Sequence, residues 1–556
     1  MDAKRAKRAG ASDSEIEAAK KVKQALDALP NMSNEDVNMV GNGQAGEIEP
    51  QVPAIIAPIA AKTYKHDGFV VFFGFGGVAE CTLPVLLRHL EIEPSQIIII
   101  DMLDKSDVLK NWTDEGVTFI QLHITEENFT ETMDAYLDSG DILIDVCYDI
   151  SCIELLKYCR VHDILYINTS VEEWCFTDGF DKRTPYDKSL YARQQEIDEE
   201  IASWIDNEGT TALLDMGANP GLISHFAKQG IKDLAKAKKV STKPIDERND
   251  YAMVAEALGV KVMLDTERDT QISVRPKEVD EFVGTWSVLG LVEEATSPVE
   301  MGWGTHENKL PEHATIPRVG PKNQIFLSQM GMHTYCRGFV PADPKDIITQ
   351  GEEPTDGYEI WGNNIRHGEA YSISKFFTTK DGKYRPTVYY CYLPSDATVA
   401  SLREFASNNY CSDNERKPYR QRVLYENDIL SGADTLGIMI GGYDNKHVWW
   451  CGSSLNIEDA RNLCPLQNAT TIQVAAGVVA GVCWLLENPK MGVIRPEDLD
   501  TDFVLKIAKS YLGTFISKEF EWSPDKNYVN SYGERKDNEL DKKNVWGFQN
   551  FISRNT

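Results

Sequence analysis

The feature that most constrains this fold is a series of short apolar runs between residues 69 and 170, separated by polar segments of helical length. Strands that are apolar throughout are buried on both faces, and their alternation with helices is typical of right-handed βαβ units. The sequence therefore predicts an α/β domain with a doubly wound parallel sheet over residues 63–220. The five expected strands lie in FVVFFGFGG from Phe69, IIIID from Ile97, FIQLHI from Phe119, DILIDVCYD from Asp141 and ILYINTS from Ile164.

The first apolar run ends in a glycine-rich turn that is typical of dinucleotide-binding Rossmann domains. Residues 74–79, GFGGVA, fit the pattern G-x-G-x-x-A between a strand and a helix. There, Gly74 allows the tight turn, Gly76 lets the backbone approach a pyrophosphate, and Ala79 lets helix and strand pack closely. The alternative is a glycine-rich turn that binds no ligand.

The choice of dinucleotide depends on Asp101, which ends the second apolar run about 20 residues after the turn. A carboxylate at this position accepts hydrogen bonds from a ribose 2′-hydroxyl and repels a 2′-phosphate, so we expect NAD rather than NADP. Further contacts are expected from the ends of later strands. The expected cofactor-binding residues are Gly74, Gly76, Gly77, Val78, Asp101, Asp149, Thr169 and Asn219.

The rest of the chain lacks this regular alternation. Helical stretches such as 251–258 and 402–406 mix with strand-like runs such as TVYYCYL, which predicts a larger α+β domain over 221–470. Residues 471–556 are expected to form C-terminal helices and a tail that packs back on the core, since the tail keeps Trp546, Phe548 and Phe551. Residues 1–62 are expected to be a flexible extension with a short helix.

Composition narrows the classes of function and compartment. Of 556 residues, 57 are Lys or Arg and 86 are Asp or Glu, and the net charge of −29 disfavours binding to nucleic acids and to anionic membrane surfaces. The 11 cysteines include no Cys-x-x-Cys pair, which favours a reducing compartment and predicts a cytoplasmic protein. The most apolar stretch, 474–486, is too short to cross a bilayer and predicts a buried helix.

No catalytic metal is expected. His306 and Glu307 are followed by His313, but the two histidines lack the spacing of a zinc-protease helix, and no cysteine lies beside them.

Seven ordered motifs carry a resemblance to a known family. The chain resembles the homospermidine synthases, polyamine enzymes related to the saccharopine dehydrogenases, from about residue 69 to about residue 551, with residues 1–62 outside. The motifs are NTSVEEW (168–174), GANPG (217–221), ERDTQ (267–271), TWSV (285–288), GWGTHE (302–307), IRHGEAYSI (365–373) and QNAT (467–470).

This resemblance implies a reaction in which NAD is a recycled prosthetic group. Two putrescines, or spermidine and putrescine, give homospermidine with release of ammonia or diaminopropane, through oxidation of an amine to an imine, transimination, and reduction by the retained NADH. It also implies a homodimer in which the larger domain provides catalysis and dimerisation. The implied active-site residues are Glu172, Asn219, Glu267, Trp286, Glu294, His367 and Asp434. Two positions depart from the family pattern: Glu173 stands where proline is expected, and Leu289 where an acidic residue occurs.

These residue types suit an aliphatic diamine. Its two ammonium groups have pKa values of about 10, as lysine has, so one end must be held charged and the other deprotonated. Glu172, Glu267 and Glu294 would bind ammonium through charge-assisted hydrogen bonds, and the indole of Trp286 offers a cation–π contact of about 0.5 to 2 kcal/mol. His367 or a glutamate would move protons, and Asn219 would orient the nicotinamide or the amine.

The sequence leaves two alternative functions open. One is a carboxyspermidine or saccharopine dehydrogenase-like enzyme that performs net reductive amination with NADPH. The other is a non-catalytic NAD-binding scaffold. Taken singly, a glutamate is more often a solvated surface residue and a tryptophan more often a core residue, so only their joint occurrence in the motifs favours the enzyme.

Overall fold

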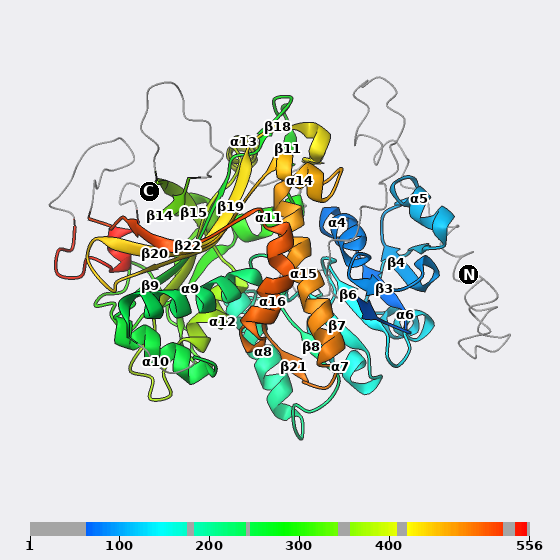
Figure 1. Cartoon of the computed structure of the whole chain (residues 1–556), viewed down its shortest axis with the longest axis horizontal. Helices are drawn as coiled ribbons and strands as arrows, with labels where there is room; N and C mark the ends of the chain where they lie inside the picture. The colour runs from blue at the N-terminus through cyan, green and yellow to red at the C-terminus, as the bar shows by residue number, and fades with distance from the viewer. Residues whose placement is uncertain are drawn as a thin grey trace.

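The computed structural model of the chain describes residues 63–174, 183–240, 245–342, 356–408, 420–525 and 540–552. Two sheets lie on either side of a layer of helices in the middle of the molecule (Figure 1). The expected N-terminal extension, 1–62, and its helix lie outside the described residues.

The first sheet has seven strands in the order β21-β8-β7-β6-β2-β4-β5, and all its pairs are parallel. The strand order reverses at β2, which lies between β4 and β6, and such a switch point is where open α/β sheets bind ligands. The predicted doubly wound sheet is thus confirmed. Its strands are β2 (Val70–Phe73), β4 (Ile97–Asp101), β5 (Thr118–Gln121), β6 (Ile142–Asp145), β7 (Leu165–Asn168), β8 (Ala212–Leu213) and β21 (Val493–Ile494).

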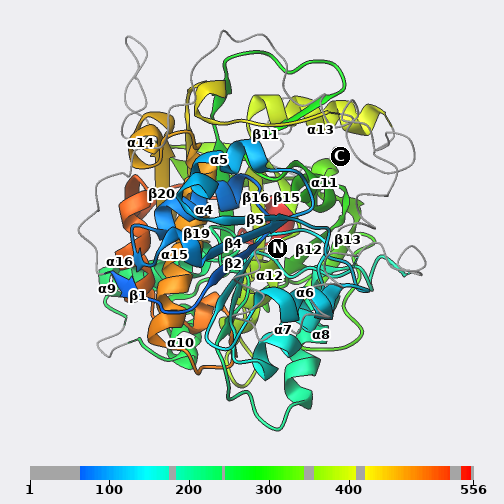
Figure 2. The same cartoon turned by 90° about the vertical axis from the view of Figure 1, so that its right-hand side faces the viewer.

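Helices cover both faces of this sheet because its side chains alternate between two cores. Val71 and Phe73 pack with residues of α6 (Phe129–Tyr136) and α7 (Cys152–Val161), whereas Val70 and Phe72 pack with residues of α4 (Gly77–Leu86), α5 (Ser106–Glu115) and α15 (Ala469–Glu487). Figure 2 shows these strands with α4, α5, α6 and α7 around them.

The second sheet has nine strands, with β9 near its centre. The main path runs β13-β12-β16-β9-β19-β20-β22, and β14 and β15 join it through β16. The pair β9–β16 is parallel, whereas β9–β19 is antiparallel. The strands are β9 (Val262–Asp269), β12 (Pro298–Gly302), β13 (Gln324–Met330), β14 (Tyr335–Pro341), β15 (Gly357–Ile365), β16 (Thr387–Leu393), β19 (Ala433–Gly441), β20 (His447–Asn456) and β22 (Thr514–Glu521).

Further elements complete this domain. The helices are α8 (Leu190–Ser203), α9 (Leu222–Lys238), α10 (Arg248–Leu258), α11 (Val288–Thr296), α12 (Gly368–Phe376), α13 (Asp396–Ser407) and α14 (Ile457–Leu463). Two small two-stranded sheets pair β11 (Glu281–Gly284) with β17 (Arg420–Val423), and β10 (Ile272–Ser273) with β18 (Ile429–Ser431). Helices mix with largely antiparallel strands here, as the sequence predicts for an α+β domain.

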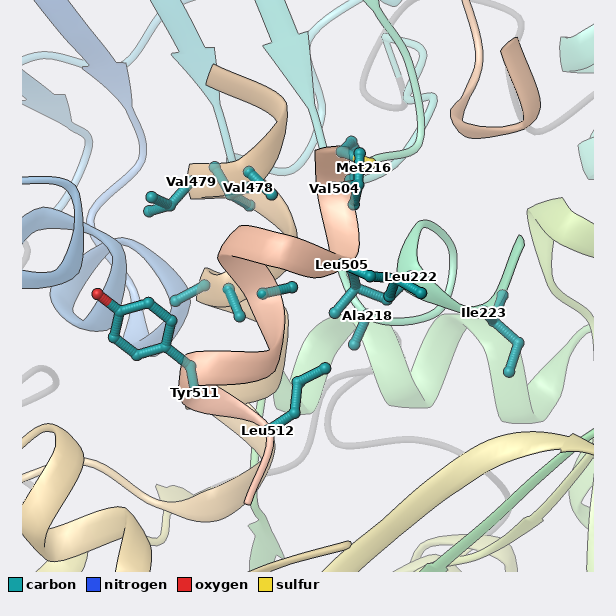
Figure 3. Packing of buried hydrophobic residues seen from close by; sticks show 14 of the residues in the cluster. Met216, Ala218, Leu222, Ile223, Val478, Val479, Val504, Leu505, Tyr511 and Leu512 are labelled. Carbon is teal, nitrogen blue, oxygen red and sulfur yellow. The ribbon is translucent and has the colours of Figure 1, made fainter. Parts of the chain in front are cut away.

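One continuous core joins the two domains. Val478 and Val479 of α15, Val504 and Leu505 of α16 (Thr501–Ala508) and Leu222 at the start of α9 belong to one buried cluster, in which Leu505 lies beside Leu222 (Figure 3). Helix α15 is long and apolar enough to span a membrane, but 83% of its most apolar window is buried inside the protein.

The last part of the chain belongs to both domains. Strand β21 pairs with β8 of the first sheet, whereas β22 pairs with β20 of the second. The side chains of Trp546, Phe548 and Phe551 are buried in the core of the second sheet. The expected boundary at 470/471 falls inside α15, because this helix packs against both domains and begins before it.

Candidate active site

The glycine turn lies at the switch point of the first sheet. Gly74 has φ +85°, and a Cβ atom there would lie 3.0 Å from the Cα of Cys147, so the turn requires glycine. Gly76 caps α4 without a side-chain hydrogen bond, and a Cβ atom on it would meet nothing within 4 Å. A free helix N-terminus beside open space fits the pyrophosphate of a dinucleotide.

The other expected cofactor residues follow the carboxyl ends of the same sheet. Asp101 ends β4, and its two oxygens accept hydrogen bonds from the backbone of Phe75 at 2.6 Å and Leu103 at 2.7 Å. Its carboxylate thereby fixes the glycine turn. Asp149, buried and with φ +71°, follows β6, Thr169 directly follows β7, and Gly77 and Val78 form the first turn of α4.

A row of buried carboxylates on β9 of the second sheet faces the carboxyl ends of the strands of the first sheet. Successive strand residues point to opposite faces, so Asp265, Glu267 and Asp269 share one face. Asn219, in the loop after β8, joins the two sheets: its Nδ2 donates to Glu267 Oε2 at 2.9 Å and to Asp265 Oδ2 at 3.2 Å. The hydroxyl of Tyr390 on β16 also donates to Glu267 Oε2, at 2.6 Å.

Burial of these carboxylates favours their neutral forms. It raises the pKa of Glu267 to about 7, although Tyr390 and Asn219 oppose the change with their hydrogen bonds. Burial likewise raises the pKa of Asp265 and, to about 6, that of Asp269. Burial thus brings the pKa values of Glu267 and Asp269 closer to neutral pH than those of exposed carboxyl groups.

Asp434 continues the row on the neighbouring strand. It lies opposite Asp269 in the antiparallel pair β9–β19 and is 1% exposed. Burial, reinforced by the charges of Glu267 and Asp269, raises its pKa well above the usual value. Its Oδ1 has no hydrogen-bond partner among the described residues.

His367 stands between two carboxylates. Its Nδ1 lies 2.8 Å from Glu369 Oε2, and its Nε2 lies 3.5 Å from Glu294 Oε1 on α11. Burial alone would lower the pKa of His367, but these carboxylates raise it well above the usual value. Burial also raises the pKa of Glu294, whose Oε2 has no hydrogen-bond partner among the described residues. Glu294 is thus left with one oxygen for a substrate ammonium or a proton.

Asp265, His367 and Glu369 each place one potential metal-ligand atom within 4.8 Å of the others. Glu369 accounts for this closeness, because it forms side-chain hydrogen bonds with both His367 and Asp265.

Glu172 belongs to a second charged group, on the loop after β7. Its Oε1 accepts a bond from Ser170 at 2.9 Å, and its Oε2 lies 3.5 Å from Arg193 of α8. Burial raises its pKa to about 7, and Glu293 reinforces the change, while Arg193 opposes it. Glu173, at the position where proline was expected, pairs with Arg193 at 3.1 Å and with Arg183.

Glu293 connects the two groups, because it precedes Glu294 on α11. It pairs with Arg193 at 3.2 Å and with Arg366, which precedes His367. Burial would raise the pKa of Glu293, but the two arginines lower it. Arg366 also lies 3.4 Å from Glu300 of β12. These ion pairs therefore involve residues that are direct sequence neighbours of Glu172, Glu294 and His367, which are expected to be catalytic.

Trp286 forms an aromatic wall at the start of α11. Its half-buried indole packs with the cluster that contains Phe282, Tyr390 and Tyr392, and it forms a hydrogen bond with Tyr392. Tyr392 stacks on Tyr390 with ring centroids 5.3 Å apart. Leu289, in the first turn of the same helix, is half-buried.

The structure therefore brings Asn219, Glu267 and Asp434 together along the row of buried carboxylates and places His367 against Glu294. Glu172 is linked to His367 and Glu294 through Arg193, Glu293 and Arg366. Sequence reasoning missed Asp265, Glu369, Tyr390, Arg193 and Arg366. Asp265 had a signal, because it continues the alternation of Glu267 and Asp269 along an apolar strand. Glu369 lies inside the quoted motif IRHGEAYSI.

Two family models match nearly the whole described chain. The saccharopine dehydrogenase NADP binding domain matches residues 70–213, and the saccharopine dehydrogenase C-terminal domain matches residues 217–519. The division between them falls in the loop between β8 and Asn219, where the two sheets meet.

Individual relatives point to a narrower family than these two models do. A homospermidine synthase of Blastochloris viridis is 34% identical over 500 residues, which cover 88% of this chain and 98% of the relative. One of Mesorhizobium japonicum is 33% identical over 496 residues, covering 88% and 96%. The crystal structure of the homospermidine synthase of Legionella pneumophila in complex with NAD matches with a TM-score of 0.77 at 33% identity, covering 89% of this chain and 99% of that one. The chain therefore belongs to the homospermidine synthases, within the saccharopine dehydrogenase family.

Proposed function

We propose that this chain is an NAD-dependent homospermidine synthase that converts two putrescines, or spermidine and putrescine, to homospermidine. The observation that carries the proposal is the buried row of carboxylates with His367 and Trp286 beside the glycine turn. A cation with two ammonium groups separated by a short alkyl chain requires such an anionic pocket with an apolar wall.

NAD fits the first domain. The uncapped start of α4 and the open space at Gly76 leave room for a pyrophosphate, and Asp101 places a carboxylate where a 2′-phosphate would be repelled. Bound NAD would take up a hydride and later return it. Val423 and Thr471 of the second domain flank Gly77 with side-chain carbons within 4 Å of a Cβ built there, which supports a closed turn that retains the dinucleotide.

The carboxylates would hold and deprotonate the amines. Glu267 and Glu172, with pKa values near 7, are ionised at alkaline pH, where they attract ammonium and accept protons. Trp286 would place the alkyl chain and cover the cation with its indole face.

His367 would act as the proton carrier between Glu369 and the reacting amine. Held charged by Glu369 and Glu294, it has a proton to donate to a departing ammonia and can recover one from the incoming diamine. Asn219 would orient Glu267 and the amine together, since its one Nδ2 group bridges Glu267 and Asp265.

We also propose that the protein works as a homodimer in the cytoplasm. The nine described cysteines form no disulfide, which supports a reducing compartment.

Product analysis tests the main proposal. The purified protein is incubated with putrescine and a catalytic amount of NAD, and products are separated by chromatography. Homospermidine and ammonia should form in amounts far above the NAD supplied, without accumulation of NADH. Added spermidine should yield diaminopropane.

The rival functions give different results. Consumption of NADPH in proportion to product, with an amino acid or carboxylated amine as substrate, would identify a saccharopine dehydrogenase-like reductive amination. A scaffold would bind NAD but form no product, and Trp286→Ala would change nothing that the assay measures. In an enzyme, Trp286→Ala should abolish turnover and leave NAD binding intact.

A further inference from the structure

Tyr390 contacts two members of the candidate site at once. It lies on β16 beside β9 and is 4% exposed. Its hydroxyl donates to Glu267 Oε2 at 2.6 Å, the oxygen that also accepts Asn219 Nδ2 at 2.9 Å. Its ring centroid lies 4.7 Å from that of His367. One side chain therefore contacts both a proposed base and the proposed proton carrier.

The contact with Glu267 helps to fix the orientation of its carboxylate. Two donors hold Oε2 from different directions, so the carboxylate cannot rotate without breaking both bonds. Asp434 of β19 forms a further side-chain hydrogen bond with Glu267. Burial and the nearby Glu267 raise the pKa of Tyr390 well above its usual value, so its hydroxyl remains a donor over the working pH range.

The same face of β16 extends this support to the aromatic wall. Tyr392, two residues further along, stacks on Tyr390 at an interplanar angle of 14° and forms a hydrogen bond with Trp286. The two tyrosines thus form a continuous surface from His367 to Trp286, with Glu267 held against its middle.

We propose that Tyr390 is a positioning residue of the synthase reaction, which holds Glu267 ionised and aimed through its hydroxyl and supports His367 with its ring. This inference rests on the proposed function. The sequence motifs that carry the family resemblance do not include Tyr390, and it bears no role among the expected catalytic residues.

The preceding residue offers a matched control. Tyr389 points to the opposite face of β16, where its ring packs against Phe548 at 5.3 Å. It is also buried, and its hydroxyl has no hydrogen-bond partner among the described residues. Tyr389→Phe and Tyr390→Phe therefore remove the same group from neighbouring buried positions, and only the second touches the site.

The test is the dependence of kcat/KM for putrescine on pH, between about pH 6 and pH 10. Loss of the Tyr390 donor disfavours the ionised Glu267, so the step that Glu267 contributes to the acid limb should move to higher pH by about one unit in Tyr390→Phe. Its kcat/KM should be about 10-fold below wild type on that limb and converge toward wild type at high pH. Tyr389→Phe should superimpose on wild type. An unmoved limb, or an equal loss at every pH, would overturn the inference.

A second measurement does not depend on turnover. In a double-mutant cycle on the free energy of unfolding, Tyr390→Phe combined with Glu267→Ala should cost less than the sum of the single changes. Simple additivity would overturn the contact. A wild-type protein that makes no homospermidine would overturn the proposed function and this inference together, whereas an unmoved limb in an active Tyr390→Phe enzyme overturns the inference alone.

Discussion

The side-chain amide of Asn219 donates to Glu267 Oε2 at 2.9 Å, and this bond joins the carboxyl edge of the first sheet to the central strand of the second. The same Nδ2 group also reaches Asp265 at 3.2 Å. One short loop after β8 thus places a donor between two buried carboxylates at the junction of the domains. The proposed cofactor and amine sites meet at this junction.

Asn219→Ala should impair the reaction more than the fold. The change takes one donor from Glu267, which keeps the hydrogen bond from Tyr390, and it removes the bridge to Asp265. A lost hydrogen bond to a charged group predicts a kcat/KM for putrescine about 10- to 100-fold lower than wild type. The measurement is steady-state product formation, with circular dichroism to check the fold. An unchanged kcat/KM would contradict a role for this bridge.

Activity should fall steeply on the acid side of neutrality. Burial raises the pKa of Glu172 and of Glu267 to about 7, so each is protonated and uncharged below that pH and loses its attraction for ammonium. A plot of log kcat/KM against pH should therefore approach a slope that reflects two protons. In Glu267→Gln the slope should fall to that of one proton, because Glu172 still titrates. A flat profile through neutral pH would contradict this assignment.

Glu267→Gln should also stabilise the protein at alkaline pH. The folded state holds a proton on Glu267 up to about pH 7, whereas a glutamate in the unfolded chain releases it near its usual pKa of 4.5. The ionised carboxylate therefore costs stability as pH rises through this window, and the cost is complete above it. The variant should gain on the order of 2 kcal/mol at about pH 8 and lose that gain below about pH 5. Denaturant unfolding at both pH values measures it, and an equal effect at both would argue against the raised pKa.

Arg366 should be more important for stability than an exposed basic residue. It pairs with Glu293 and Glu300 and is 3% exposed, so Arg366→Met leaves two enclosed carboxylates without this partner. We expect a loss of about 3 kcal/mol in the free energy of unfolding. The control is Lys110→Met, because Lys110 pairs with Asp114 on the surface of α5 and should change stability by less than about 0.5 kcal/mol. Similar losses in the two variants would contradict the network.

The first domain was predictable because its signals are local. Apolar runs such as 97–101 correspond to strands with bounds that differ by few residues, and the turn at Gly74 lies where the motif predicts it. Strand β21 was not predictable: two residues, Val493 and Ile494, carry no periodic pattern, and they join the first sheet only because α15 returns the chain to it.

The site was only partly predictable for a related reason. Glu267 and His367 lie in recognisable motifs, but their partners are set by strand register and helix packing. Tyr390 reaches Glu267 across the pair β9–β16, and Arg193 reaches Glu172 from α8; neither contact follows from spacing in the sequence. The acidic alternation at Asp265, Glu267 and Asp269 was visible, but alternation alone does not distinguish a buried face from a solvated one.

The most direct test of the account follows a labelled hydride. Putrescine with deuterium on both carbons next to nitrogen is incubated with the protein and NAD, in the presence of excess unlabelled NADH, and the homospermidine is analysed by mass spectrometry. If one bound dinucleotide takes up and returns the same hydride, the product keeps every deuterium. Loss of one deuterium from the product would show reduction by the free NADH pool and would contradict the account.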